Sequence, residues 1–376
     1  MTSTHPMLAT ATHDEASEQF FIRDLKSYLG EEIEPFQRRI AERLDPGEGH
    51  NRRVAALFER LHEQDAFRAW ASVRRTAQEQ LWSVVSASVE RQSETLNDLA
   101  RQAPALGSLT LDPSFRTPAY LAEHDVHLMP GGYQADGGDS EVSQGAIMDR
   151  GGAVYMLGRN GGLMNDVRGH TLAAHLFARF PNFAPSTILE LGCGVGASAV
   201  PVARYFPHAR FYAIDVGASV LRYAHARSAW LGADIHFVQG DAEHVPFADE
   251  SVDLVFSCVL MHETSAEAIP AIMAECLRVL KPGGIVVHLE VPQRYDSMDL
   301  WGKIRGEVER VYNNEPCWQV AISTEYDAVL RAIGFEEVAV GYQSATPHAV
   351  PGAGGFSDTS QGVFRSWFVV SGRKPS

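Results

Sequence analysis

The stretch from Ile188 to Gly196 reads ILELGCGVG, and it decides the fold of this 376-residue chain. An apolar run carries one acid, Glu190, and ends in glycines at alternate positions before the run ASAVPVA at 197–203. This order predicts a buried strand, a tight turn and the start of a helix. Glycine suits such a turn because the backbone bends sharply and a ligand can approach it without meeting a side chain. The stretch therefore predicts a site for a nucleoside-like ligand.

Strands and helices alternate on both sides of that turn along the second half of the chain. Apolar periodicity predicts strands at 188–191, 210–214, 235–238, 252–257, 285–291, 336–340 and 363–370. Helical periodicity predicts intervening helices near 197–205, 218–231, 267–280 and 324–333. The βαβ order indicates an α/β fold, in which helices cover both faces of a mostly parallel sheet.

The first half of the chain differs in composition. Helical periodicity and strong helix formers predict three or four helices, with breaks near Pro35 and at 45–47. A segment rich in proline and glycine follows, which is typical of a linker or a lid. We expect four segments: a disordered tail at 1–14, a helical N-terminal domain at 15–105, a loop-rich linker or lid at 106–154, and an α/β domain at 155–376.

Charge and composition exclude several classes of protein. The formal net charge of −15 argues against a nucleic-acid partner, because phosphates would be repelled. No apolar run approaches the roughly 18 residues that cross a bilayer, so no membrane association is expected. The first residues lack the basic and apolar regions of a secretory signal. The four cysteines are scattered and suit a reducing compartment, so we expect a cytoplasmic protein.

Three further motifs narrow the ligand of the glycine turn. By itself, Gly192-x-Gly194-x-x-Ala197 also fits a dinucleotide fingerprint. A second strand, however, ends in an acid at Asp215, where it can meet ribose hydroxyls. The run QGDA at 239–242 follows the third strand, and the run LRVLKPGG at 277–284 predicts a helix that ends at Pro-Gly-Gly.

With these motifs in this order, the chain from about residue 155 to 374 resembles the class I S-adenosylmethionine-dependent methyltransferases. In motif style it is most similar to the ubiquinone-biosynthesis and small-molecule group. The resemblance implies a Rossmann-like, doubly wound, seven-stranded mixed sheet whose last strand is antiparallel. It also implies that the cofactor, S-adenosylmethionine, lies at the carboxyl ends of the first strands, where open α/β sheets bind ligands in general.

The resemblance also assigns cofactor-binding residues. Glu190 would lie near the methionine amine, and the backbone of Gly192, Gly194 and Val195 would line the methionine portion. Asp215 would bind the ribose hydroxyls. The remaining implied contacts are Val216 with the adenine ring, Asp241 and Ala242 with the adenine edge, and the backbone of Cys258 with the cofactor.

His262 and Glu263 are the candidate catalytic residues. Methyl transfer needs an aligned acceptor and, for some acceptors, removal of a proton. In many small-molecule methyltransferases a histidine just beyond the fourth strand removes that proton, and the pair His262-Glu263 resembles that arrangement. The alternative is a histidine that caps the next helix or packs under the sheet.

Other histidines and acids raise the question of a metal ion. His288 and Glu290 lie two apart on the predicted fifth strand and share a face, so with His262 and Glu263 they form a possible cluster. Imidazole and carboxylate suit several divalent ions, but no spacing here is diagnostic, and we assign no metal ligand. We interpret the motif His124-Asp125-x-His127 as part of a surface loop.

Two segments are candidates for shaping an acceptor pocket. The segment 292–323 is longer than a minimal connection and carries aromatic residues, which predicts a substrate cap. An alternative is a helix packed on the core through the stripe Leu300, Ile304, Val308 and Val311. The loop around Tyr133 is a candidate lid. The predicted substrate-binding residues are Tyr133, Glu290, Tyr295 and Trp301.

The leading hypothesis is an enzyme that methylates oxygen, nitrogen or carbon of a small molecule, with His262 as general base. A nicotinamide-dependent oxidoreductase and a non-catalytic cofactor-binding regulator are the alternatives. The run SCVL at 257–260 lacks the Asn/Asp-Pro-Pro-Tyr-like motif of protein and nucleic-acid methyltransferases. Small-molecule O-methyltransferases of similar length often carry a helical dimerising domain, so a homodimer is a further expectation.

Overall fold

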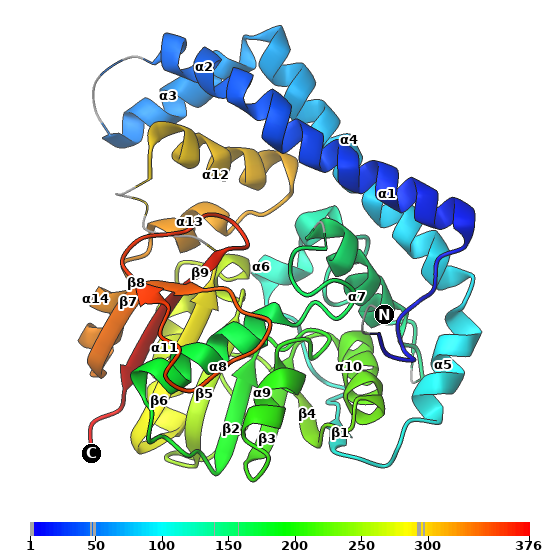
Figure 1. Ribbon diagram of the computed structural model, residues 1–376, viewed down its shortest axis with the longest axis vertical. Helices are drawn as coiled ribbons and strands as arrows, with labels where there is room; N and C mark the ends of the chain where they lie inside the picture. Colours follow the sequence, from blue (N-terminus) through cyan, green and yellow to red (C-terminus); the bar gives the residue numbers. More distant parts are fainter. Residues whose placement is uncertain are drawn as a thin grey trace.

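A nine-stranded mixed sheet forms the base of the molecule in the computed structural model (Figure 1). The structure describes residues 4–376 except 46, 48, 49, 139, 157, 292–294, 296 and 297. Parts of the predicted break at 45–47 and of the predicted cap at 292–323 therefore lie outside the described residues. The strands are β1 (Ser108–Thr110), β2 (Thr187–Leu191), β3 (Arg210–Asp215), β4 (Ile235–Gln239), β5 (Val252–Cys258), β6 (Leu280–Glu290), β7 (Glu336–Ser344), β8 (Phe356–Ser357) and β9 (Ser366–Arg373).

The strand order is β1-β4-β3-β2-β5-β6-β9-β7-β8. β4, β3, β2, β5 and β6 are parallel, whereas β9 is antiparallel to both β6 and β7. The predicted mixed sheet with an antiparallel last strand is confirmed. The predicted count of seven is corrected by two short edge strands, β1 and β8. β6 also begins at Leu280 and includes the predicted Pro-Gly-Gly turn, because Gly283 and Gly284 exchange backbone hydrogen bonds with Lys374.

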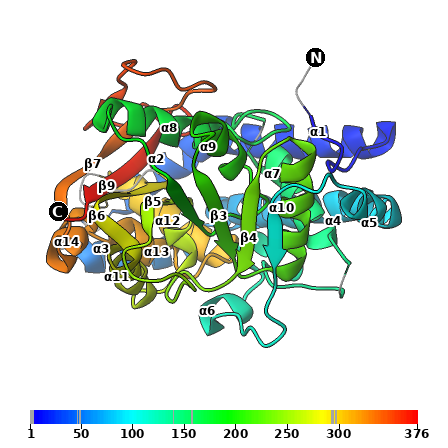
Figure 2. The same cartoon turned by 90° about the horizontal axis from the view of Figure 1, so that it is seen from below.

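Helices cover both faces of the sheet (Figure 2). Successive strand side chains point to opposite faces, so Ile188 packs in one core and Leu189 in the other. Both faces are buried, which explains the continuous apolar strands. One core also holds side chains of α8 (Val167–Arg179), α9 (Ala199–Tyr205) and α10 (Ala218–Trp230); the other holds side chains of α11 (Ala268–Val279) and α14 (Tyr326–Ile333).

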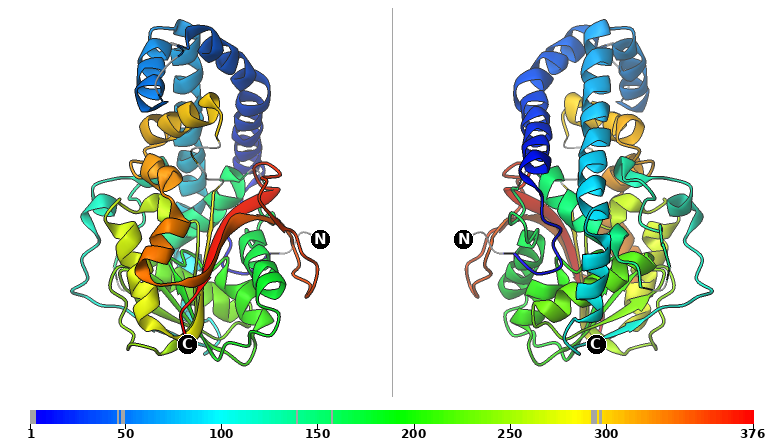
Figure 3. Two further views of the ribbon diagram at one scale, coloured as in Figure 1. Left: turned by 90° about the vertical axis from the view of Figure 1, so that its left-hand side faces the viewer. Right: turned by 90° about the vertical axis from the view of Figure 1, so that its right-hand side faces the viewer.

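The N-terminal helices stand above the carboxyl edge of the sheet (Figure 3). They are α1 (His13–Tyr28), α2 (Glu34–Leu44), α3 (His50–His62) and α4 (Asp65–Glu90). α5 (Ser93–Arg101) lies lower, beside α10 (Figure 1), where the carbonyl of Leu99 accepts a hydrogen bond of 3.1 Å from the indole of Trp230. The predicted break near Pro35 is absent from the described chain: a π-helical turn (Leu29–Ile33) joins α1 to α2, and Pro35 lies in the first turn of α2. Proline lacks the N–H for a regular helical hydrogen bond, and the π-helical turn directly before it is where the α-helical pattern is interrupted.

Helix α12 (Leu300–Tyr312) packs among these N-terminal helices rather than on the sheet. Trp301, Ile304 and Val308 share one buried cluster with Leu57 and Trp70. The predicted apolar stripe is therefore only partly correct, since Val311 is exposed. Helix α12, which lies far from the first helices in the sequence, thus completes their hydrophobic core.

Two other expectations about the first half of the chain differ from the structure. The predicted disordered tail is wrong for residues 4–14, because Met7 and Ala9 are buried and His5 bonds to Asp149. The predicted linker at 106–154 contains α6 (Ala119–Ala122) and α7 (Ser143–Tyr155), and most of α7 is buried. In the part of the chain that the structure describes, no helix is both long and apolar enough to span a membrane.

Candidate functional site

The glycine turn after β2 has the conformation that only glycine adopts readily. Gly192, Gly194 and Gly196 have φ values of 63°, 50° and 73°. A Cβ on Gly192 would lie 2.6 Å from the side chain of Leu260, and one on Gly194 would lie 2.8 Å from Met148. The sequence motif therefore gives a backbone surface with no room for side chains at the edge of the sheet.

Acids stand at the ends of the neighbouring strands. Asp215, the last residue of β3, accepts hydrogen bonds from the backbone N–H groups of Gly194 at 2.8 Å and Gly217 at 3.1 Å. Burial raises the pKa of Asp215, and these backbone hydrogen bonds oppose the rise. Asp241 follows β4 and is half-buried, while Cys258 ends β5 with its thiol pKa raised by burial. These residues lie along one edge of the sheet, as predicted.

Two buried atoms beside the turn, one from an acidic and one from a basic side chain, have no hydrogen-bond partner among the residues that the structure describes. They are Oε2 of Glu190, on β2, and Nε of Arg168, on α8. Burial raises the pKa of Glu190 well above its usual range, although the positive charge of Arg168 reduces the effect. Buried polar atoms are nearly always paired, so this pair of atoms indicates a ligand with one anionic and one cationic group. Sequence reasoning missed Arg168, which no motif marks.

His262 and Glu263 lie on a short 3₁₀ turn, η3 (Met261–Glu263), directly after β5. Nδ1 of His262 lies 2.9 Å from Oε2 of Glu290, and Nε2 lies 3.3 Å from Oε1 of Glu263. Glu290 also accepts a hydrogen bond of 2.6 Å from the backbone N–H of Met261. Glu290 therefore positions the turn and the imidazole.

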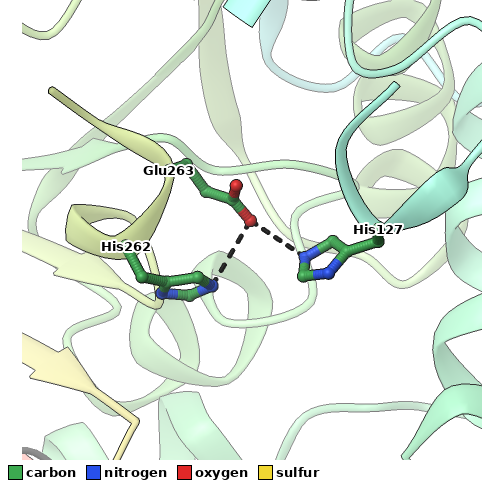
Figure 4. A group of neighbouring side chains, drawn as sticks. All are labelled: His127, His262 and Glu263. Atoms are coloured by element: carbon green, nitrogen blue, oxygen red, sulfur yellow. Dashed lines mark ion pairs between the residues drawn. The ribbon is translucent and has the colours of Figure 1, made fainter. Parts of the chain in front are cut away.

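A third residue, His127, joins this pair from the turn η2 (Val126–Leu128), as Figure 4 shows. Its Nε2 lies 2.9 Å from Oε1 of Glu263, and its Nδ1 lies 2.9 Å from Oε1 of Glu315. The interpretation of His127 as a surface-loop residue is wrong. Its φ of 57° is unusual for a residue other than glycine, and its carbonyl accepts hydrogen bonds from Trp82 at 2.7 Å and Gln78 at 3.0 Å, which hold the backbone there.

The imidazoles of His127 and His262 and the carboxylates beside them shift one another's pKa. Burial lowers the pKa of His127, but the carboxylates of Glu315 and Glu263 outweigh it and raise the pKa to about 10. The same balance raises the pKa of His262 well above its usual range, through Glu263 and Glu290. Burial alone would raise the pKa of Glu263, yet the two histidines lower it. The neighbouring carboxylates therefore favour the protonated form of both imidazoles.

One cavity of about 850 Å³ joins the glycine turn to this group and extends into the helical layer. Its far end is lined by charged side chains that pair with one another: Arg305 with Glu34 at 3.0 Å, and Arg74 with Glu309 at 2.9 Å. The indole N–H of Trp301 donates to Glu34 at 2.9 Å. The cavity is thus built from the sheet edge at one end and from α2, α4 and α12 at the other.

The cavity brings together most of the residues that the sequence singled out. Lining it are Tyr133, Glu190, Gly192, Gly194, Val195, Asp215, Val216, Asp241, Ala242, Cys258, His262, Glu263 and Trp301. Three expectations differ from the structure. Glu290 lies behind His262, and Tyr295 is not among the described residues that line the cavity. Nδ1 of His288 lies 2.8 Å from Oγ of Ser257, so His288 does not join the predicted cluster.

Comparison with known proteins matches residues 188–284 to a family described as "Methyltransferase domain". A probable phthiotriol/phenolphthiotriol dimycocerosates methyltransferase 2 from Mycobacterium ulcerans is 28% identical over 171 residues, which cover 46% of this chain and 55% of that protein. A malonyl-[acyl-carrier protein] O-methyltransferase from Methylococcus capsulatus is 42% identical over 101 residues, 27% of this chain and 35% of that protein.

A solved structure, of a putative O-methyltransferase from Nostoc punctiforme, is 18% identical and covers 59% of this chain and 60% of that one, with a TM-score of 0.43. The chain spans only about a third to a half of the length of the curated relatives named above. The domain match favours methyltransferases over the nicotinamide-dependent and non-catalytic alternatives.

Proposed function

We propose that this chain, which carries a class I methyltransferase domain, is an S-adenosylmethionine-dependent methyltransferase that acts on a small molecule. One observation supports it above the others: a single cavity connects the glycine turn of that domain to the group around His262 and Glu263. A cofactor site and an acceptor site must share one space for methyl transfer, because the reacting atoms must meet in line.

The unpartnered atoms beside the turn fit this cofactor. Its methionine portion carries an ammonium and a carboxylate, which would bind Glu190 and Arg168 respectively. The backbone at Gly192, Gly194 and Val195 would line the same portion. Asp215 would accept the ribose hydroxyls, Val216, Asp241 and Ala242 would contact the adenine, and the backbone of Cys258 would complete the wall.

When bound, S-adenosylmethionine supplies a methyl group activated by the sulfonium. A lone pair of the acceptor atom forms the new bond to that carbon, while the electron pair of the carbon–sulfur bond stays on sulfur. Tyr133 and Trp301 line the acceptor side of the cavity. His262 would serve as the general base: burial lowers its pKa, but the carboxylates of Glu263 and Glu290 outweigh burial and raise it, which strengthens its hold on a proton taken from the acceptor. Glu290 is a positioning residue, since it acts through His262.

Calorimetric titration tests the proposal directly. The full chain should bind one S-adenosylmethionine, and S-adenosylhomocysteine should compete for the same site. Incubation with methyl-labelled cofactor and a panel of hydroxylated, amino and keto metabolites should then label an acceptor. A chain that binds neither cofactor form would contradict the proposal, and a panel without a labelled product calls for a wider set of acceptors, because only the cofactor titration decides the class.

We also propose a homodimer and a cytoplasmic location without a nucleic-acid partner. Large exposed apolar side chains support the dimer, since four of them lie on α1 and α2: Phe20, Phe21, Tyr28 and Phe36. Light scattering should give twice the mass of the chain, and Phe21→Asp should shift it toward the single mass. A monomer at all concentrations would overturn the dimer and leave the methyltransferase assignment standing.

A further inference from the structure

The group formed by His127, His262 and Glu263 has the geometry of an incomplete metal site (Figure 4). One possible ligand atom from each of the three side chains lies within 4.8 Å of the other two. Two of the separations are 2.9 Å and 3.3 Å. Ligands about 2.0–2.2 Å from a shared ion are about 2.8–3.6 Å apart in octahedral or tetrahedral geometry. The separations of 2.9 Å and 3.3 Å both fall in this range, and the third, which is at most 4.8 Å, needs only a small side-chain adjustment for the three residues to share one ion.

The surroundings of both imidazoles also match those of metal-bound histidine. Metal-ligating histidines usually donate their second ring N–H to a carboxylate, which fixes the ring and turns the other nitrogen toward the ion. Nδ1 of His127 lies 2.9 Å from Glu315, and Nδ1 of His262 lies 2.9 Å from Glu290. Each carboxylate is buried. Two histidines from distant segments thus have the same supporting contact.

This supporting contact leaves the two Nε2 atoms facing one carboxylate oxygen. If each Nδ1 donates its proton to its own glutamate, each Nε2 presents a lone pair to Oε1 of Glu263, which is also an acceptor. Either a second proton on each ring or a cation must stand between them. Tyr133 donates to the same Oε1 at 2.9 Å and Trp318 packs edge-on against His262, so the three ligand atoms are held converging on one point.

We propose that His127, His262 and Glu263 bind one divalent transition-metal ion, and that its open positions bind an oxygen atom of the methyl acceptor. Two imidazoles with one carboxylate suit Zn²⁺ or another first-row ion rather than Mg²⁺ or Ca²⁺, which prefer oxygen ligands. All three residues line the cavity, so the ion's free positions face the space beyond the glycine turn. The acceptor class is then a hydroxyl or an adjacent pair of oxygen atoms, a conclusion that rests on the proposed function.

Cobalt binding to the full chain tests the site without any assay of activity. The chain is stripped of metal with dipicolinate and titrated with CoCl₂, and the visible absorption of Co²⁺ reports ligation by the protein. Wild type should bind one Co²⁺. His127→Gln and Glu263→Gln should each weaken Co²⁺ binding by more than about tenfold. Loss of a residue that only supports a ligand already costs about ten- to a hundredfold, so loss of a ligand itself should cost at least as much. His124→Gln, which changes a histidine three residues away in the same loop, should bind like wild type.

Two further measurements separate failure of the metal site from failure of the proposed function. Each variant is titrated with S-adenosylmethionine in the presence of chelator, which shows that the cofactor half of the cavity is folded. Acetohydroxamate, a small bidentate oxygen ligand, should shift the Co²⁺ spectrum of wild type. Wild-type binding no tighter than that of His127→Gln, or an unshifted spectrum, would overturn the metal inference. Cofactor binding without Co²⁺ binding overturns the metal site alone, whereas Co²⁺ binding without cofactor binding overturns the proposed function.

Discussion

Asp215 and Gly194 are joined by a hydrogen bond of 2.8 Å, which the backbone N–H of Gly194 donates to Oδ2 of the aspartate. The other carboxylate oxygen accepts from Gly217 at 3.1 Å. These two hydrogen bonds therefore fix the glycine turn and the end of β3 relative to each other. Such preorganisation favours binding because little order has to be created when a ligand arrives.

Replacing the Asp215 carboxylate should weaken the binding of S-adenosylmethionine. In Asp215→Ala, the ribose hydroxyls lose a charged acceptor and the turn loses its anchor. A hydrogen bond to a charged group contributes about 1.5–3 kcal/mol, so affinity should fall by about ten- to a hundredfold in calorimetry. Asp234→Ala, which changes an exposed acid at the start of β4, is the control and should bind normally. Equal affinities in the two variants would contradict this role of Asp215.

The buried acid on β2 should make cofactor binding release a proton. Burial raises the pKa of Glu190 well above its usual range, so its carboxyl holds a proton more readily than that of an ordinary glutamate. An ammonium group favours the carboxylate, so binding should expel the proton and affinity should rise with pH. Calorimetry at pH 6 in two buffers of different ionisation enthalpy counts the protons. Glu190→Gln should bind more weakly and release none, whereas Glu243→Gln should release as many as wild type.

A buried ion pair between α7 and α10 should dominate the stability of this part of the fold. Oδ2 of Asp149 accepts from Arg227 at 3.1 Å and from Tyr223 at 2.9 Å, and all three side chains are fully buried. Asp149→Asn leaves a buried guanidinium without its counter-charge, which costs about 3–5 kcal/mol. Urea unfolding measures the loss. Asp65→Asn, in an exposed pair with Arg68, should change stability little, and similar losses in both variants would refute the argument.

A buried neutral histidine should destabilise the chain in acid. Burial lowers the pKa of His288 to about 3, whereas the unfolded value is about 6.5. Its contribution is therefore present above pH 6.5 and is lost as the pH falls toward 3, because the unfolded chain binds the proton first. Between pH 7.5 and 5.5 wild type should lose about 1.4 kcal/mol more than His288→Gln. Exposed His208→Gln should follow wild type in the same urea titrations.

The sequence predicted the sheet and the glycine turn at its carboxyl edge because both depend on local patterns. Continuous apolar runs define the central strands, and the turn conformation at Gly192 and Gly194 is tied to residue type. The acid at the end of β3 followed from the same logic. The N-terminal tail was mispredicted because small polar residues hide Met7 and Ala9, whose burial depends on helices far along the chain.

The group around Glu263 was predicted only in part, for a physical reason. His262 follows a strand and was found by position. His127 and Glu315 are 188 residues apart, and the fold alone brings them together. No periodicity marks His127, whose backbone is held by Trp82 from another helix. Tyr295 was predicted to bind substrate because it is an aromatic residue of the expected cap, yet it is not among the described residues that line the cavity.

The position of α12 has a consequence for how the far end of the cavity can change in shape. The far end of the cavity is made jointly by α12 and by the first helices, which share Trp301 and Trp70 in one cluster. Neighbouring substitutions in such a cluster are not independent. A chimera in which the first hundred residues come from a relative should therefore keep an intact cavity only when the α12 segment comes from the same relative. The two parts of the chain would then have to change together in evolution.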